Sequence, residues 1–193
     1  MEALVDAERP ALVERLPGAE LVESKLMTEL STLGHPARVV AVFRRADLPA
    51  GTDAPTGLAL WRVGDPGNVG TLVRTADALG PAFVALSAGC ADPTSPKALR
   101  ASAGAVFRVP LARFDDAPRP WVALVPRAGT PLWELELGER ATFVLGAERA
   151  GVPEDVAAKC DELASVPLAA GAESLNVAVA GAIALYERRR RSV

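Results

Sequence analysis

The sequence predicts an α/β fold in which helices cover both faces of a mainly parallel sheet. From residue 58 onward, short apolar runs alternate with helical patterns, as expected when strands are joined by crossover helices. Short apolar strands of this kind are typical of a sheet that is buried on both sides. With 50% hydrophobic and 23% charged residues, the 193-residue chain has the composition of an ordinary soluble protein with a sizeable core.

The predicted elements of this sheet follow one another without an internal repeat. Apolar runs predict strands at residues 58–63, 83–86, 106–109, 122–125, 142–145 and 164–166. Helical patterns predict one helix at 69–79, which Gly80 and Pro81 end, and a short helix at 95–101.

The first fifty or so residues differ in character from the rest. Helical patterns occupy 7–16 and 23–33, and the apolar run 38–43 predicts a strand. A turn-rich stretch then predicts a linker. We therefore divide the chain into an N-terminal segment, 1–52, and a larger domain, 53–193. A segment of about fifty residues forms only a marginal core, so we expect it to pack on the larger domain or to be loosely ordered.

The last helical pattern is strongly apolar. Residues 175–186 carry no charge, so we expect a helix that is buried on most sides. Ser174 precedes it and is either a simple N-cap or part of a polar group at the helix N-terminus. Four arginines, Arg188 to Arg191, follow. They form either a basic surface or a cationic helix end that the helix dipole favours.

Composition limits the possible classes of function. His35 is the only histidine, and Cys90 and Cys160 lack metal-binding spacing, so we expect neither a metal nor histidine-based catalysis. Free thiols indicate a reducing cytoplasm, and no apolar run reaches the length of a membrane span. The net charge of −3 does not favour nucleic-acid binding by the whole surface. Nearly all positive charges are arginines, however, and these suit phosphate contacts.

A glycine-rich turn follows the first predicted strand of the larger domain. Gly64, Gly67 and Gly70 resemble a dinucleotide-binding turn, and Asp92 lies where a ribose-binding acid could sit. The spacing is G-x-x-G-x-x-G, however, and Pro66 occupies the tight turn. A Rossmann-type nucleotide-binding enzyme is therefore a less favoured alternative, and a purely structural turn is another.

Three separated motifs resemble those of the SpoU (TrmH-type) RNA ribose methyltransferases of the SPOUT superfamily. They are DPGNVGTLVRTA at 65–76, FVLGAERAG at 143–151, and VPL at 166–168 followed by ESLNVAVA at 173–180. They occur in the family's order and at its spacing. The family often has Met where Leu168 stands and Ser where Ala178 stands, and both changes are conservative.

The resemblance implies a deep C-terminal trefoil knot that binds S-adenosylmethionine, mostly through backbone groups. Gly138, Gly146, Gly151 and Gly171 could let the crossing backbones approach closely. The positions that match the family's cofactor-binding residues are Leu145, Gly146, Val166, Leu168 and Leu175. Considered singly, each of these residues also fits an ordinary core.

The resemblance also implies an activity, the transfer of a methyl group to a ribose 2′-hydroxyl of RNA. The catalytic residues that it implies are Asn68, Arg74, Glu148, Ser174 and Asn176. Because an arginine is effectively always charged, we interpret Arg74 as a fixed cation beside the acceptor oxygen. Glu148 is then either an orienting partner for Arg74 or the proton acceptor.

The implied partners are RNA and a second copy of the chain. Lys97 and Arg100 lie in a block that resembles one in the ribosomal-RNA branch of the family, and Arg108 follows it. We predict all three as RNA contacts and favour ribosomal over transfer RNA. The segment 1–52 resembles the second half of a ribosomal-protein-like RNA-binding domain. A non-catalytic RNA-binding protein that retains the knot is the alternative from another class.

Overall fold

The computed structural model describes residues 2–31 and 37–191, so His35 lies outside the described residues. The chain divides into two compact units, Met1–Asp47 and Leu48–Val193. Residues just after this division belong to the second unit, because the Gly51 N–H donates to the Leu111 carbonyl and the Leu111 N–H to the Pro49 carbonyl. The division therefore precedes the predicted boundary at residues 52 and 53.

The first unit is a small three-stranded sheet with short helices. Its strands have the order β2-β1-β3, with β2 parallel and β3 antiparallel to β1. The elements are β1 (Glu2–Asp6), η1 (Pro10–Arg15), β2 (Glu20–Val22), α1 (Ser24–Leu30), β3 (Val39–Val42) and η2 (Arg45–Asp47). The strand predicted at 38–43 is confirmed as β3. The prediction missed β1 and β2, and its two helices are shorter than expected.

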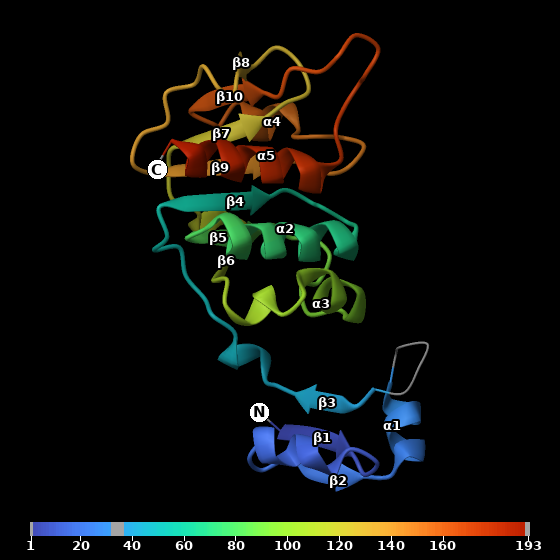
Figure 1. The fold of residues 1–193 in the computed structure, drawn as a ribbon. Helices are drawn as coiled ribbons and strands as arrows, with labels where there is room; N and C mark the ends of the chain where they lie inside the picture. The colour runs from blue at the N-terminus through green and yellow to red at the C-terminus, as the bar shows by residue number, and fades with distance from the viewer. Residues whose placement is uncertain (1, 32–36, 192–193) are drawn as a thin grey trace. The chain divides into compact units, whose positions relative to one another are not determined.

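The second unit contains a seven-stranded sheet of order β6-β5-β4-β9-β7-β10-β8, in which every pairing is parallel (Figure 1). The strands are β4 (Thr56–Leu60), β5 (Ala82–Leu86), β6 (Leu111–Arg113), β7 (Trp121–Leu124), β8 (Thr130–Pro131), β9 (Ala141–Leu145) and β10 (Glu162–Ser165). The predicted parallel sheet is therefore confirmed.

Helical elements cover both faces of this sheet. They are α2 (Pro66–Leu79), α3 (Pro96–Ser102), η3 (Ala105–Phe107), η4 (Phe114–Asp116), α4 (Glu154–Ala157) and α5 (Val177–Arg190). Figure 1 shows α2 and α5 side by side on one face, where they pack against each other and against the central strands. On β4, Leu58 and Leu60 face that layer, whereas Ala59 belongs to the second core with Phe114 and Val156. The alternation of buried side chains thus builds a core on each side of the sheet.

One predicted strand is wrong. Residues 106–109 are apolar, but the chain forms the 3-10 helix η3 there, and the edge strand β6 begins only at Leu111. Ala103 and Gly104 adopt left-handed backbone conformations, with φ of 49° and 83°, and turn the chain before it can extend. Val106 and Val109 are buried in the first core. The apolar run therefore reports burial, which a 3-10 helix satisfies as well as a strand does.

The C-terminal helix α5 starts later and ends later than predicted. Asn176 is its N-cap, because the Asn176 side chain accepts hydrogen bonds from the Ala178 and Val179 N–H groups at 2.8 and 3.4 Å. The interpretation of Ser174 as the N-cap is therefore wrong. The helix is buried along most of its length, but Val179 and Tyr186 remain 47% and 58% exposed. Among the described residues, no helix is long and apolar enough to cross a membrane.

One of the glycines assigned to a backbone crossing has that role here. A Cβ atom on Gly146 would lie 1.9 Å from the carbonyl carbon of Gly151, so any other residue would force the two backbones apart. Gly138, by contrast, has open space around its Cα, and the packing requires no glycine there. The knot itself stays a prediction from the resemblance.

Candidate active site

Three loops meet at one edge of the sheet. Because all seven strands are parallel, the loops that follow β4, β9 and β10 leave from the same edge, where ligands of open α/β sheets bind. The first loop leads into α2, the second carries Glu148, and the third, 166–176, leads into α5. Each loop contains one of the three sequence motifs, so the fold brings the motifs together.

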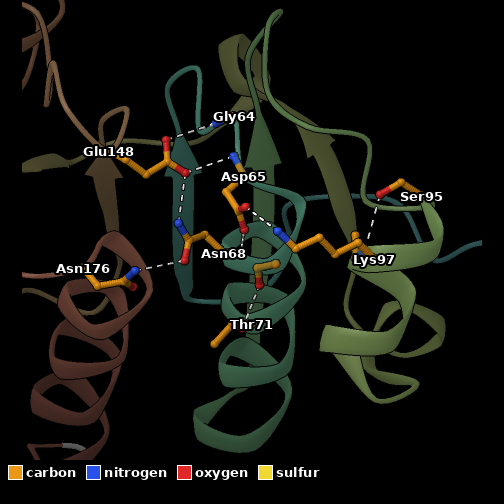
Figure 2. Close-up of polar contacts among 10 residues, drawn as sticks. Gly64, Asp65, Asn68, Thr71, Ser95, Lys97, Glu148 and Asn176 are labelled. Carbon is orange, nitrogen blue, oxygen red and sulfur yellow. Dashed lines mark hydrogen bonds and ion pairs between the residues drawn. The ribbon is translucent and has the colours of Figure 1, made fainter. Parts of the chain in front are cut away.

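A carboxylate joins two of these loops. The Glu148 carboxylate accepts hydrogen bonds from the Asp65 N–H at 3.0 Å, the Asn68 side-chain amide at 3.0 Å and the Gly64 N–H at 3.3 Å (Figure 2). Partial burial of this carboxyl group opposes its ionisation, but the hydrogen bonds from Asn68 and the backbone prevail and lower the pKa of Glu148. Glu148 is therefore an ionised hydrogen-bond acceptor at neutral pH.

The network continues to the third loop. The Asn176 side-chain amide donates to the Asn68 side-chain oxygen at 3.1 Å, and Figure 2 shows the two side chains facing one another. A carboxylate can only accept, so Glu148 requires that Asn68 present its NH₂ group to it and its oxygen to Asn176. The orientation of both amides is thereby set, and the N-termini of α2 and α5 are linked.

A second acid holds the start of α2. The Asp65 side chain accepts from the Asn68 N–H at 3.0 Å as the N-cap and from the Lys97 ammonium at 2.6 Å. The hydrogen bond from Lys97, followed by that from the Asn68 N–H, lowers the pKa of Asp65. Sequence reasoning missed Asp65 as part of the site. An aspartate directly before a proline at the first helical position is the signal that could have identified it.

A pocket opens beside this network. All five residues predicted to bind the cofactor line it: Leu145, Gly146, Val166, Leu168 and Leu175. Glu148 and Ser174 line it as well. Its walls are mainly apolar, with charged side chains at Glu148 and Arg149, and such a lining fits an adenosyl group attached to a charged amino-acid part. The residues present therefore suit S-adenosylmethionine.

The pocket does not lie over the glycine turn that the dinucleotide-binding alternative requires. A Cβ atom on Gly70 would lie 2.3 Å from the Ala98 carbonyl oxygen, so this glycine lets α2 pack against α3. Asp92, the proposed ribose-binding acid, accepts hydrogen bonds from the N–H and hydroxyl groups of Thr94. The turn therefore has the structural role that was the third alternative.

Comparison with known proteins agrees with this arrangement. Residues 55–186 match the sequence model of the SpoU rRNA Methylase family, and this range includes all three motifs. The chain belongs to the SpoU rRNA methylase family. An uncharacterized tRNA/rRNA methyltransferase of Synechocystis sp. is 35% identical over 98% of this chain and 75% of its own length. The 23S rRNA (guanosine(2553)-2′-O)-methyltransferase RlmP of Bacillus subtilis is 37% identical over 84% of this chain and 68% of its own length.

Solved structures of SpoU proteins share the fold. A putative RNA methyltransferase of the TrmH family from Porphyromonas gingivalis matches with a TM-score of 0.85 and 35% identity, covering 98% of this chain and 82% of its own. The SpoU methyltransferase AviRb from Streptomyces viridochromogenes, solved in complex with AdoMet, matches with a TM-score of 0.78 and 25% identity, covering 99% and 82%.

Arg74 lies apart from the SpoU site described above. It is exposed on α2 six residues after Asn68, which is about 9 Å further along the helix axis. Within residues 2–31 and 37–191, no hydrogen bond or ion pair holds its guanidinium group. The partner of Glu148 is thus Asn68 rather than Arg74, and the Arg74 side chain is available to an external ligand.

Two of the predicted RNA contacts are occupied within the chain. Lys97 is paired with Asp65, although its side chain remains 57% exposed. Arg108 binds both carboxylate oxygens of Asp77, with the shortest contact at 2.6 Å. Arg100 lies in the last turn of α3. To contact RNA, Lys97 and Arg108 would have to exchange or share these carboxylate partners.

Proposed function

We propose that this chain transfers a methyl group from S-adenosylmethionine to a ribose 2′-hydroxyl of ribosomal RNA. It is an S-adenosylmethionine-dependent RNA methyltransferase of the SpoU family. The observation that carries the proposal is that three distant motifs form one polar network beside one pocket. Ribosomal RNA is favoured because RlmP, at 37% identity, is named for 23S rRNA. This substrate would place the enzyme in the cytoplasm.

The bound cofactor would supply an electrophilic methyl group on a sulfonium sulfur. The apolar walls, including Leu145, Leu168 and Leu175, would hold the adenosyl part and exclude water. Methyl transfer is an in-line displacement, so the network must align the acceptor oxygen with the methyl group. Asn68 and Asn176, whose amide orientations are set by hydrogen bonds, are rigid positioning groups for this purpose.

We assign different roles to Glu148 and Arg74. Glu148 has a lowered pKa and already accepts three hydrogen bonds, so it is a poor base at neutral pH. We interpret it as the residue that positions Asn68. Arg74 is the uncommitted cation on the same helix, and it stabilises the negative charge that develops on the acceptor oxygen. Ser174, which lines the pocket, completes the polar group.

Labelled methyl groups provide the test. The protein is incubated with radiolabelled cofactor and ribosomal RNA from cells that lack it, and the RNA is then hydrolysed in alkali. A 2′-O-methyl group blocks alkaline cleavage, so label in alkali-stable dinucleotides supports the proposal. Label in mononucleotides would indicate base methylation. RNA binding without any label would support the non-catalytic alternative. Transfer RNA serves as the competing substrate.

We further propose that the enzyme is a homodimer. On α5, Val179 and Tyr186 are exposed and lie seven residues apart, so they share one side of the helix. Covering apolar side chains across a two-fold axis is favourable. Light scattering at micromolar concentration should give twice the chain mass. Replacing Tyr186 with Glu should yield monomers, and a monomeric wild type would contradict the proposal.

The N-terminal segment, 1–52, has a separate proposed role in binding RNA. It lies outside the matched family range of 55–186 and resembles part of an RNA-binding domain. We expect it to contribute to RNA affinity and not to cofactor binding, since every pocket-lining residue lies after it in the chain.

A further inference from the structure

Arg149 lies next to Glu148 on a tightly held turn. Ala147 and Gly151 pair as an antiparallel bridge, and the Gly151 N–H donates to the Ala147 carbonyl at 2.8 Å. The close packing of Gly146 on Gly151 supports the same turn from below. The backbone that carries Glu148 and Arg149 is therefore fixed, and a ligand meets two charges whose positions are already set.

The charges around the pocket are few. Fifteen residues line it, and only Glu148 and Arg149 among them have a charged side chain. Glu148 is engaged by three donors, as described above. Within the described ranges 2–31 and 37–191, no hydrogen bond or ion pair holds the Arg149 guanidinium. The pocket thus has apolar walls and one uncommitted cation.

We propose that Arg149 binds the carboxylate of the amino-acid part of S-adenosylmethionine. This assignment rests on the function proposed above. The apolar walls suit the adenosyl part, but they offer nothing to the carboxylate. The guanidinium group presents paired donors that match a carboxylate, and such charge-assisted pairs are stronger than neutral hydrogen bonds.

The neighbouring acid makes this arrangement compatible with the rest of the cofactor. The sulfonium and ammonium groups of S-adenosylmethionine are positive, and a lone arginine would repel them. Glu148 carries the opposite charge on the adjacent residue, so the pair has no net charge. Arg149 can therefore attract the carboxylate without a penalty for the cationic parts of the ligand.

Two ligands that differ only in the carboxylate test this assignment. They are S-adenosylhomocysteine and its decarboxylated form, S-adenosyl-3-thiopropylamine, which keeps the adenosyl, thioether and amine groups. Calorimetry on the full chain should show that the wild type binds the first roughly tenfold more tightly, as expected for one charge-assisted pair. Arg149→Ala should bind it roughly tenfold more weakly than the wild type, and bind the decarboxylated ligand within about twofold of the wild type.

Arg127→Ala is the matched control. Arg127 is an exposed arginine directly after Pro126, which lines the pocket, but Arg127 itself does not line it. The control should retain the full preference for the carboxylate. Arg149→Lys should keep part of it, because lysine retains the charge but not the paired donors.

Three results would overturn the assignment. The first is an Arg149→Ala protein that keeps the preference for the carboxylate. The second is equal weakening of both ligands, which would indicate a general effect on the pocket. The third is a loss of RNA affinity alone, which would make Arg149 a phosphate contact. A wild type that binds neither adenosyl ligand would overturn the proposed function together with this assignment, whereas the first three results leave that function intact.

Discussion

The two ends of helix α5 carry polar clusters with opposite characters. At its N-terminus, the network of Glu148, Asn68 and Asn176 is exposed and lies beside a pocket. In the last turns, Glu187 accepts two hydrogen bonds from Arg190 and one from Arg191, and its side chain is only 11% exposed. Both clusters are built around a carboxylate, but they differ in what is left to bind a ligand.

The C-terminal cluster is saturated from within the chain. Arg191 also donates to the carbonyl groups of Leu132 and Leu135, and Arg188 donates to that of Glu139. Three of the four tail arginines are therefore committed to the protein itself, and the arginine run is mainly a structural tie to the loop before β9. At the other end, Arg74 and Arg149 have no partner in the described chain. Local saturation thus separates the structural cluster from the functional one.

The largest expected effect comes from Arg74→Ala. Methyl transfer should fall at least about 1000-fold, as it does when a charge-stabilising group is lost from an active site. Cofactor affinity should not change, because Arg74 does not line the pocket. Transfer rates and calorimetry with S-adenosylhomocysteine measure the two effects. If a folded Arg74→Ala protein lost cofactor affinity, the role at the acceptor would be wrong.

Glu148→Gln should lower the transfer rate about 100-fold, the cost of a small misplacement of reacting groups. A glutamine would point an NH₂ group at donors that now face a carboxylate, and the Asn68 amide would lose its orientation. The pH profile separates this role from proton transfer. Because the pKa of Glu148 is lowered from 4.5, its contribution should be present above that value and be lost only as the pH falls through the lower folded-state pKa. A Glu148-dependent step between pH 6 and 8 would instead identify a proton acceptor.

Arg191→Ala should affect the other end of α5 and only stability. The variant loses hydrogen bonds to Glu187 and to two carbonyl groups, which we expect to cost about 2 kcal/mol of unfolding free energy. Denaturant unfolding measures this change, and cofactor affinity should stay that of the wild type. Arg189→Ala, in the same tail but exposed and outside the cluster, is the control and should change stability by less than about 0.5 kcal/mol.

The same cluster predicts a loss of stability in acid. Hydrogen bonds from Arg190, followed by those from Arg191, lower the pKa of Glu187 below 4.5. This contribution to stability is complete above that value and disappears as the pH falls through the lowered pKa. The difference in stability between the wild type and Glu187→Gln should therefore shrink below about pH 4. A difference that stays constant down to pH 2 would show that the ionised carboxylate is not what stabilises the cluster.

The smallest expected effect concerns the N-terminal unit. Deleting residues 1–47 removes the whole first unit and keeps Leu48, which packs on the core of the second. RNA affinity should fall about fivefold, and its salt dependence should weaken by about 0.7 for each lost phosphate contact with a single strand. Cofactor affinity should remain unchanged. Undiminished RNA binding would restrict substrate recognition to the second unit.

The secondary structure was predictable where burial and periodicity agree. The strands β4, β5, β7 and β9 are continuous apolar runs between turns, and the sequence locates each within a few residues. The prediction failed at 106–109 because apolar side chains buried by a 3-10 helix look like those of a strand. It also missed β1 and β2, whose patterns in the small unit are short and partly exposed.

The sequence by itself determined the family and the members of the site, because the three motifs are local strings of residues. Only the tertiary structure decided which partner each polar group takes. Asn68 binds Glu148 and Asn176, which lie 80 and 108 residues away, and Arg191 binds a carbonyl group 56 residues away. Hydrogen bonds act over about 3 Å and depend on direction. Partner choice therefore follows from which loops the strand order brings to one edge, and that order is a property of the whole sheet.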